Sequence, residues 1–147
     1  MNKNAVKATM LRLEREELEH AVGKYQEYLE SARLDRTEPL EPDEKGQART
    51  AAIYAESFEQ PVHVHTDKIE KLQSIDFGPK MKVEEGAIVK FGGRHFVIAV
   101  ATGRFNCEGN CLMGISVFAP IFSEIEDKKA GDAIVFNGRK IVLEEVL

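Results

Sequence analysis

The sequence has no tryptophan, only two cysteines and no run that approaches the roughly 18 consecutive apolar residues needed to cross a membrane. The segment from Met1 to Arg15 also lacks the apolar core of a secretory signal. These absences argue against a membrane-spanning or secreted protein. We therefore expect a cytoplasmic location.

Cysteine is scarce, and both cysteines lie close together at Cys107 and Cys111. Two thiols in a reducing compartment are poor evidence for a disulfide. A zinc site would need four ligands, and His95 is the one further candidate in the neighbouring strands. We interpret the cysteines as small residues that flank the turn Glu108-Gly109-Asn110.

Positive charge is scarce in the first half of the chain. Residues 1–78 carry 11 Lys and Arg against 16 Asp and Glu, a net charge of −5, whereas residues 79–147 carry 9 against 9, a net charge of zero. Proteins that grip nucleic acid by its phosphates normally present a basic stripe. The acidic first half therefore disfavours direct DNA binding.

Two apolar stripes of matching helical spacing dominate this acidic half. The first contains Leu18, Val22, Tyr25, Leu29 and Ala32, and the second contains Ala51, Ala55, Phe58, Val62, His65, Ile69 and Leu72. Steps of four and three residues place each stripe on one narrow helical face, as in a coiled coil. The spacing predicts helices over about 5–33 and 44–74. Residues 1–76 should then form an antiparallel coiled-coil finger, with the acidic, proline-containing loop 34–47 at its tip.

Pro61 interrupts the second predicted helix, because proline lacks a backbone donor and clashes with the preceding turn. The stripe keeps its register across it, so we expect a kink or short break after which Pro61 opens the next helical segment. His65 belongs to the stripe. His63 and His65 are interpreted either as a ligand pair or as one solvated and one partly buried histidine, and the second interpretation is favoured.

After Leu72 the apolar period changes from helical to alternating, and Asp76-Phe77-Gly78-Pro79 marks a boundary. Strands rich in Val, Ile and Phe are predicted over residues 87–91, 94–102, 112–118, 133–137 and 140–146, with glycine-containing turns between them. We expect antiparallel hairpins. A short helix is predicted within residues 121–129, ending at Gly131, so the fold class is α+β.

Residues 114–125 (GISVFAPIFSEI) and 128–132 (KKAGD) carry a resemblance. They are similar to the carboxy-terminal signature of the GreA/GreB family of bacterial transcription elongation factors, in which a strand leads into Ser-Pro-Leu-Gly, a short helix, Gly-Lys-Lys-Val-Gly-Asp and two closing strands. The resemblance covers about residues 83–147 at the level of motifs. The predicted finger matches the family in its helical architecture more than in its amino-acid sequence.

The resemblance implies that residues 79–147 form an FKBP-like antiparallel β-sheet domain that docks on RNA polymerase at the rim of its secondary channel, while the finger enters the channel. It places Pro120, Ile121, Phe122 and Ser123 in the segment that touches the polymerase. Ala119, Phe122 and Ser123 depart from the family's usual serine, glycine and arginine. We expect Phe122 to be the exposed anchor, and the protein to act as a monomer that meets nascent RNA only indirectly.

At the finger tip, the family presents an acidic residue, two spacers, glutamate and asparagine, and the corresponding segment here is Glu41-Pro42-Asp43-Glu44-Lys45. Carboxylate oxygens are ligands that Mg²⁺ prefers, and a protruding pair can help hold an ion shared with a polymerase active centre. Glu41 and Glu44 are the predicted metal ligands, and Asp43 or Glu44 the residue that orients the attacking water. The alternative is structural: Asp43 caps the second helix, Glu44 suits its first turn and the tip is merely solvated.

The leading functional hypothesis is an elongation factor that is not itself an enzyme and that stimulates the polymerase's own cleavage of backtracked transcripts. A second is a non-catalytic channel-binding inhibitor or a relative of the Rnk regulators, which share the carboxy-terminal unit. A third is a peptidyl-prolyl isomerase. It is disfavoured because fold does not fix function and the chain has few aromatic residues for a proline pocket.

Overall fold

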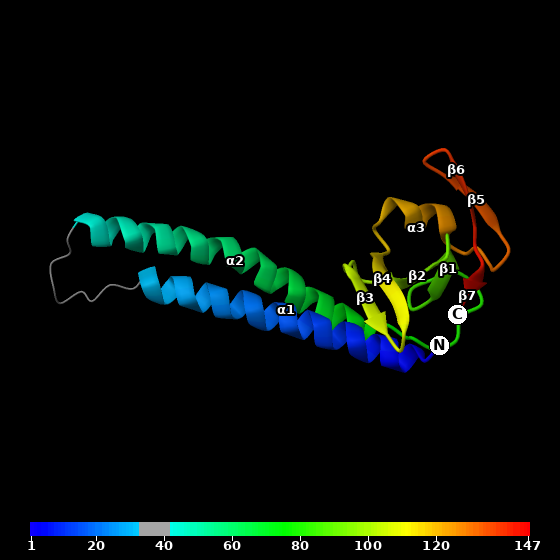
Figure 1. Ribbon diagram of the computed structural model, residues 1–147, viewed down its shortest axis with the longest axis horizontal. Helices are drawn as coiled ribbons and strands as arrows, with labels where there is room; N and C mark the ends of the chain where they lie inside the picture. The colour runs from blue at the N-terminus through cyan, green and yellow to red at the C-terminus, as the bar shows by residue number, and fades with distance from the viewer. Residues whose placement is uncertain (33–41) are drawn as a thin grey trace. The chain divides into compact units, whose positions relative to one another are not determined.

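The computed structural model describes the backbone of residues 1–32 and 42–147; the side chains of 31–48, 52, 54 and 55 lie outside the described part. Two long helices are present, α1 (Lys3–Ala32) and α2 (Pro42–Ser74), and they run side by side in opposite directions (Figure 1). Both predicted helices are therefore confirmed to within a few residues. Among the described helices, none combines the length and apolar character that crossing a membrane requires.

Of the kink or short break expected at Pro61, the break is wrong, because α2 is helical on both sides of this residue. Phe58, Val62 and His65 are all half-buried and continue one helical face across the proline. An interior proline removes one helical hydrogen bond, at a cost of about 3 kcal/mol. Continued packing of that face on both sides offsets this loss, and the helix does not need to restart.

Residues Arg12–Ile69 form one compact unit, an antiparallel helical hairpin. Ala21 and Ala51 are buried in it, and the rings of Tyr28 and Phe58 stack with their centroids 6.0 Å apart. The predicted stripe is present, since Leu18, Val22, Tyr25 and Leu29 are half-buried, although Ala32 and Ala55 lie outside the described side chains. The contact face of α1 is wider than predicted, because Glu14, Ala21 and Tyr28 also belong to it.

The second compact unit combines Met1–Leu11 with Glu70–Leu147. Its strands are β1 (Ile88–Phe91), β2 (Arg94–Ala99), β3 (Arg104–Cys107), β4 (Asn110–Ser116), β5 (Ala133–Phe136), β6 (Arg139–Val142) and β7 (Glu145–Val146), with the short helix α3 (Pro120–Ile125) between β4 and β5. A five-stranded sheet has the order β3-β4-β2-β1-β7, and β5 pairs with β6 apart from it. The α+β class is confirmed. The domain boundary expected between residues 76 and 79 stays a prediction.

The sheet differs from the expected run of antiparallel hairpins in two places. Strand β4 pairs with β2 in parallel. In the sequence β3 comes between these two strands, and it forms an antiparallel hairpin with β4 that reverses the chain direction. The last predicted strand is divided into β6 and β7, and the N–H of Leu143 between them donates to the carbonyl of Asp132. This division lets β7 pair with β1 and complete the sheet.

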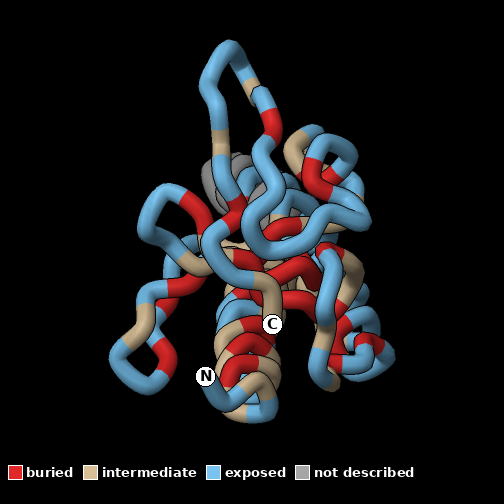
Figure 2. The backbone as a smooth tube through the Cα atoms, turned by 90° about the vertical axis from the view of Figure 1, so that its right-hand side faces the viewer, coloured by how far each residue is buried: buried red, intermediate tan, exposed pale blue. Residues whose placement is uncertain are grey.

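The core of this unit lies between the sheet and α3, where Phe122 and Ile125 of α3 join buried residues of β1, β2 and β4. Buried positions are concentrated in β1, β2 and β4, although a few residues of the connecting segments, such as Val83 and Leu143, are also buried, and the tips of the hairpins are exposed (Figure 2). Position 114 of β4 requires glycine for a steric reason. A Cβ placed there would lie 2.2 Å from the carbonyl oxygen of Val100, so no larger residue fits without moving backbone.

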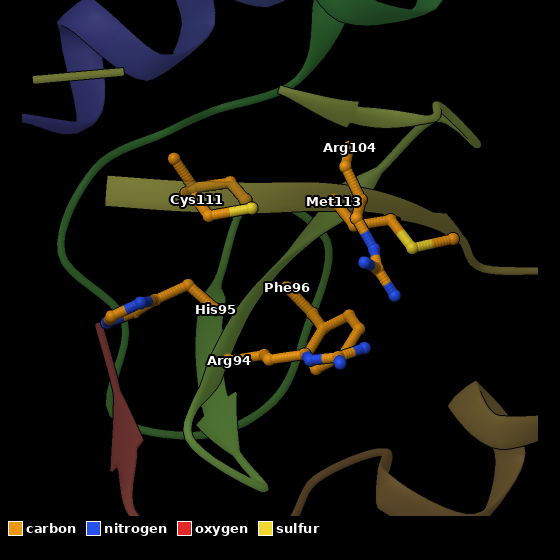
Figure 3. Close-up of a pocket in the computed structure, with 7 residues that line it drawn as sticks. Arg94, His95, Phe96, Arg104, Cys111 and Met113 are labelled. Carbon is orange, nitrogen blue, oxygen red and sulfur yellow. The ribbon is translucent and has the colours of Figure 1, made fainter. Parts of the chain in front are cut away.

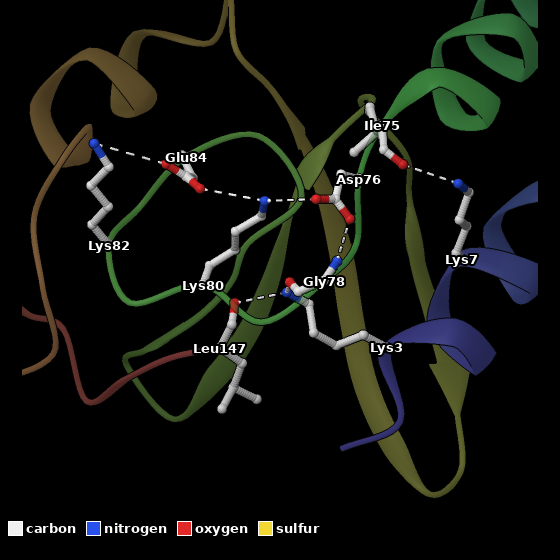
Figure 4. A network of polar contacts seen from close by, with 9 residues as sticks. All are labelled: Lys3, Lys7, Ile75, Asp76, Gly78, Lys80, Lys82, Glu84 and Leu147. Carbon is white, nitrogen blue, oxygen red and sulfur yellow. Dashed lines mark hydrogen bonds and ion pairs between the residues drawn. The ribbon is translucent and has the colours of Figure 1, made fainter.

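Lysines at the start of α1 bind backbone carbonyls of the same unit (Figure 4). Lys3 Nζ donates to the carbonyl oxygens of Gly78 and Leu147, at 2.7 and 2.9 Å, and Lys7 Nζ donates to that of Ile75 at 3.0 Å. Burial lowers the pKa of Lys3 to about 8, and the neighbouring charge of Lys80 adds to the effect. The N-terminal turns are thus fastened to the segment that leads into the sheet.

Candidate functional site

The predicted catalytic and metal-binding residues of the tip lie outside what the structure describes. Glu41 precedes the described part of α2, and the side chains of Asp43 and Glu44 are not described. The backbone of α2 begins at Pro42, which places Asp43 and Glu44 in its first turn. Their assignment as metal ligands and as water-orienting groups therefore stays a prediction.

The histidines that were weighed as a ligand pair have different surroundings. The His65 side chain is 20% exposed and its Nδ1 lies 2.6 Å from Oε2 of Glu14, whereas the His63 side chain is 68% exposed and stands 4.0 Å from Glu59. Among the residues whose side chains are described, no group of three His, Cys, Asp or Glu is placed to hold a metal. His65 is thus a packed partner of a buried glutamate in the helical hairpin.

The two cysteines lie on opposite faces of the β3–β4 hairpin. Cys107 is opposite Asn110 and Cys111 is opposite Asn106, and neighbouring residues of a strand point to opposite faces. Cys107 is buried, with its sulfur 3.5 Å from the Thr9 hydroxyl, and Cys111 is exposed. The register therefore separates the two thiols, as expected for residues that merely flank the turn.

The segment whose residues resemble the GreA/GreB signature forms a tight connection from β4 to α3. The backbone N–H of Phe118 donates to the Ser116 hydroxyl oxygen at 3.1 Å, and the N–H of Ala119 donates to the Ser116 carbonyl at 3.0 Å. Ala119 is the N-cap residue in an extended conformation, and Pro120 opens the helix. No side chain caps α3, because Ala119 has no oxygen to offer its first N–H groups.

The predicted partner-binding residues divide between surface and core. Pro120 and Ser123 are exposed, Ile121 is half-buried and Phe122 is only 8% exposed. The expectation that Phe122 is the exposed anchor is therefore wrong: one turn of α3 carries it, with Ile125, into the core. Phe118 is the exposed aromatic residue of this segment, with 91% of its surface accessible.

Phe118, Pro120 and Ile121 line an open groove with a volume of about 580 Å³. Its wall and floor come from the strands β1, β2 and β4, the β2–β3 connection, the segment after β4 with the start of α3, and Phe136 of β5. The remaining lining residues include Phe91, Phe96, Met113 and Ile115. A groove of this composition suits apolar side chains of a macromolecular partner, since exposed apolar patches commonly mark interaction sites.

Sequence reasoning found one edge of this groove and missed the rest. Phe118 lies two residues after the end of β4 at Ser116, where alternation no longer predicts which way a side chain points. Phe96 and Met113 face each other only because β2 and β4 pair in parallel, at positions far apart in the sequence. Predicting that these residues line one groove would have required knowledge of the order of the strands in the sheet.

No protein-family model matches this chain, and a search of curated proteins found no match. A solved structure described as that of the transcription factor Gfh1 is similar over 95% of this chain and 90% of that chain, with 18% sequence identity and a TM-score of 0.34. A likeness this distant carries no argument about function. The functional assignment therefore depends on the residues themselves.

Proposed function

We propose that this protein is a transcription elongation factor of the GreA/GreB type that binds bacterial RNA polymerase at its secondary channel. The observation that carries the proposal is the apolar groove beside the signature segment. Residues 114–132 are similar to the family's polymerase-docking signature, and the same segment supplies Phe118, Pro120 and Ile121 to the groove. Sequence resemblance and exposed apolar surface thus coincide at one place.

The groove suits docking better than chemistry. Its lining is formed by aromatic and aliphatic side chains together with Thr102 and Ser116, whose hydroxyl oxygens already bind backbone N–H groups of Gly114 and Phe118. Such a surface contributes affinity by removing apolar area from water. On this proposal the sheet unit binds the polymerase and is not an enzyme.

The finger tip would act on the polymerase's own hydrolytic reaction. Glu41, Asp43 and Glu44 offer a donor set of carboxylate oxygens, which fits Mg²⁺. Such an ion, shared with the polymerase, would activate a water for cleavage of a backtracked transcript. Glu41 and Glu44 would help retain it, and Asp43 or Glu44 would orient the water. Three carboxylates at the tip without a cage give few fixed ligands, so the isolated protein should not hold the ion tightly.

The test of docking is the affinity for bacterial RNA polymerase core enzyme of a Phe118→Asp variant. Phe118 is almost fully exposed, so the change leaves the core intact, and a central aromatic anchor should cost about tenfold or more in affinity. Met81→Asp is the matched control, because Met81 is 87% exposed in the same unit and does not line the groove. Equal affinities for the two variants would contradict the assignment of the groove.

A further inference from the structure

Two arginines lie at the end of the apolar groove, on strands that flank β4. Arg104 of β3 and Phe96 of β2 both stand opposite Met113 of β4, so these three residues form one row across the sheet. Arg94 precedes Phe96 by two residues and therefore faces the same side of β2. The sheet thus brings together two guanidinium groups that are ten residues apart in the sequence.

These residues line a small cavity of about 140 Å³. Figure 3 shows Arg94 and Arg104 extending to the same side, next to Phe96 and Met113, while His95 points away from them. Phe96 and Met113 also line the apolar groove described above. The arginine-bearing cavity and the groove therefore adjoin each other at these two residues.

Neither arginine has a carboxylate partner among the described residues, and no acidic residue lines the cavity. Several lysines of the same unit differ, since Lys71 pairs with Glu85, Lys80 with Asp76 and Glu84, and Lys82 with Asp127. The zero net charge of residues 79–147 thus conceals a local excess of positive charge at this cavity. A guanidinium group binds a carboxylate in a bidentate geometry, with parallel hydrogen bonds.

We propose that Arg94 and Arg104 recognise carboxylates of a protein segment whose apolar side chains occupy the groove. The inference rests on the proposed docking function and states the chemistry of the partner: an acidic and apolar segment of the polymerase. Charge complementarity at the rim of an apolar interface selects the partner and its orientation. It also accelerates association at low ionic strength.

A nucleic-acid strand fits the site less well. Two arginines would neutralise about two phosphates, whereas proteins that bind nucleic acid through its backbone commonly make about 6–10 such contacts. One face of the Phe96 ring is covered by Phe91, with ring centroids 4.3 Å apart and an interplanar angle of 13°. A base could stack on Phe96 only from its other face.

The test compares an Arg94→Glu/Arg104→Glu double variant with the wild-type chain in binding to bacterial RNA polymerase core enzyme, at about 50 mM and about 300 mM salt. We expect the variant to bind about tenfold more weakly at low salt, with a slower association rate and a smaller difference at high salt. Arg139→Glu is the matched control, because Arg139 is an exposed arginine of β6 outside both cavities. An Arg94→Lys/Arg104→Lys variant keeps the positive charge but loses the bidentate hydrogen bonding of the guanidinium group. Its affinity for the polymerase should lie between those of the wild type and the double glutamate variant.

The outcomes separate this inference from the proposed function. If Phe118→Asp weakens binding and the double glutamate variant behaves like Arg139→Glu, the arginine inference is wrong and the docking groove stands. If neither variant weakens binding, both assignments fail. If the arginine variant loses affinity for a fluorescent single-stranded oligonucleotide while its polymerase binding is unchanged, the occupant is nucleic acid and the inference is overturned.

Discussion

His65 of α2 and Glu14 of α1 form a polar contact between the two long helices, with Nδ1 of the histidine 2.6 Å from Oε2 of the glutamate. The Glu14 side chain is only 6% exposed, and Lys68 Nζ lies 4.0 Å from its other oxygen. A buried carboxylate is costly unless it is paired, so His65 satisfies a group that would otherwise destabilise the hairpin.

His65→Leu should lower the free energy of unfolding by about 2 kcal/mol, because it leaves Glu14 buried with a weaker partner. The double variant Glu14→Leu/His65→Leu should return to within about 1 kcal/mol of the wild type, since two apolar residues replace the polar pair. His63→Leu is the control and should change stability by less than about 0.5 kcal/mol, because His63 is exposed. Urea unfolding followed by circular dichroism measures all three. A double variant that is less stable than His65→Leu would contradict the account.

Lys3 makes stability depend on pH in a defined direction. Its folded-state pKa is lowered from 10.5 to about 8, so between these values the unfolded chain binds more protons and stability rises with pH. The stability of the wild type relative to Lys3→Met should therefore increase as the pH is raised from about 8 toward about 10. Urea unfolding at successive pH values measures the difference.

Lys82 provides the contrasting control for this series. Its hydrogen bond to Asp127 raises its pKa, so the stability it contributes is fully present below 10.5 and is lost above that value. The difference between the wild type and Lys82→Met should accordingly show no rise over the same window. A flat profile for Lys3→Met would mean that the Lys3 ammonium is not disfavoured by its surroundings.

Ala119→Ser should stabilise the sheet unit by about 0.5–1 kcal/mol. Ala119 already has the extended backbone of an N-cap residue, and a serine hydroxyl there could accept from an N–H of the first turn of α3. Ala130→Ser, an exposed change in the loop after α3, is the control. A denaturant midpoint that shifts no more for Ala119→Ser than for this control would show that the missing N-cap does not lower the stability of the sheet unit.

Helical spacing and glycine-containing turns predicted both long helices, the short helix and most strands, because these features depend on neighbours within one or two turns. The parallel pairing of β2 with β4 was not predictable in this way. It depends on β3, whose four residues alternate between exposed and buried but are too few for the alternation to predict a strand on its own. The Phe96, Met113 and Arg104 row follows from that pairing and was missed with it.

Single positions were harder to predict than elements. Glu14 belongs to a run of charged residues and has the sequence signature of a solvated face, and His65 and Lys68 on the other helix make its burial possible. Phe122 and Phe118 are two aromatic residues of one segment, and the helical turn that begins at Pro120 decides which of them is buried. Such choices are made by tertiary packing.

The central claim is tested most directly by transcript cleavage in stalled elongation complexes of bacterial RNA polymerase, with the wild-type chain, Glu41→Ala, Glu44→Ala and Lys45→Asn. The account predicts that the wild type stimulates cleavage and that either alanine variant abolishes the stimulation with unchanged polymerase affinity, because these carboxylates act only in the transition state. Lys45→Asn should be as active as the wild type or more so, since an ammonium beside the carboxylates competes for their oxygens. A wild type that slows elongation, with no effect of either glutamate on cleavage, would contradict the account and favour a channel-blocking inhibitor.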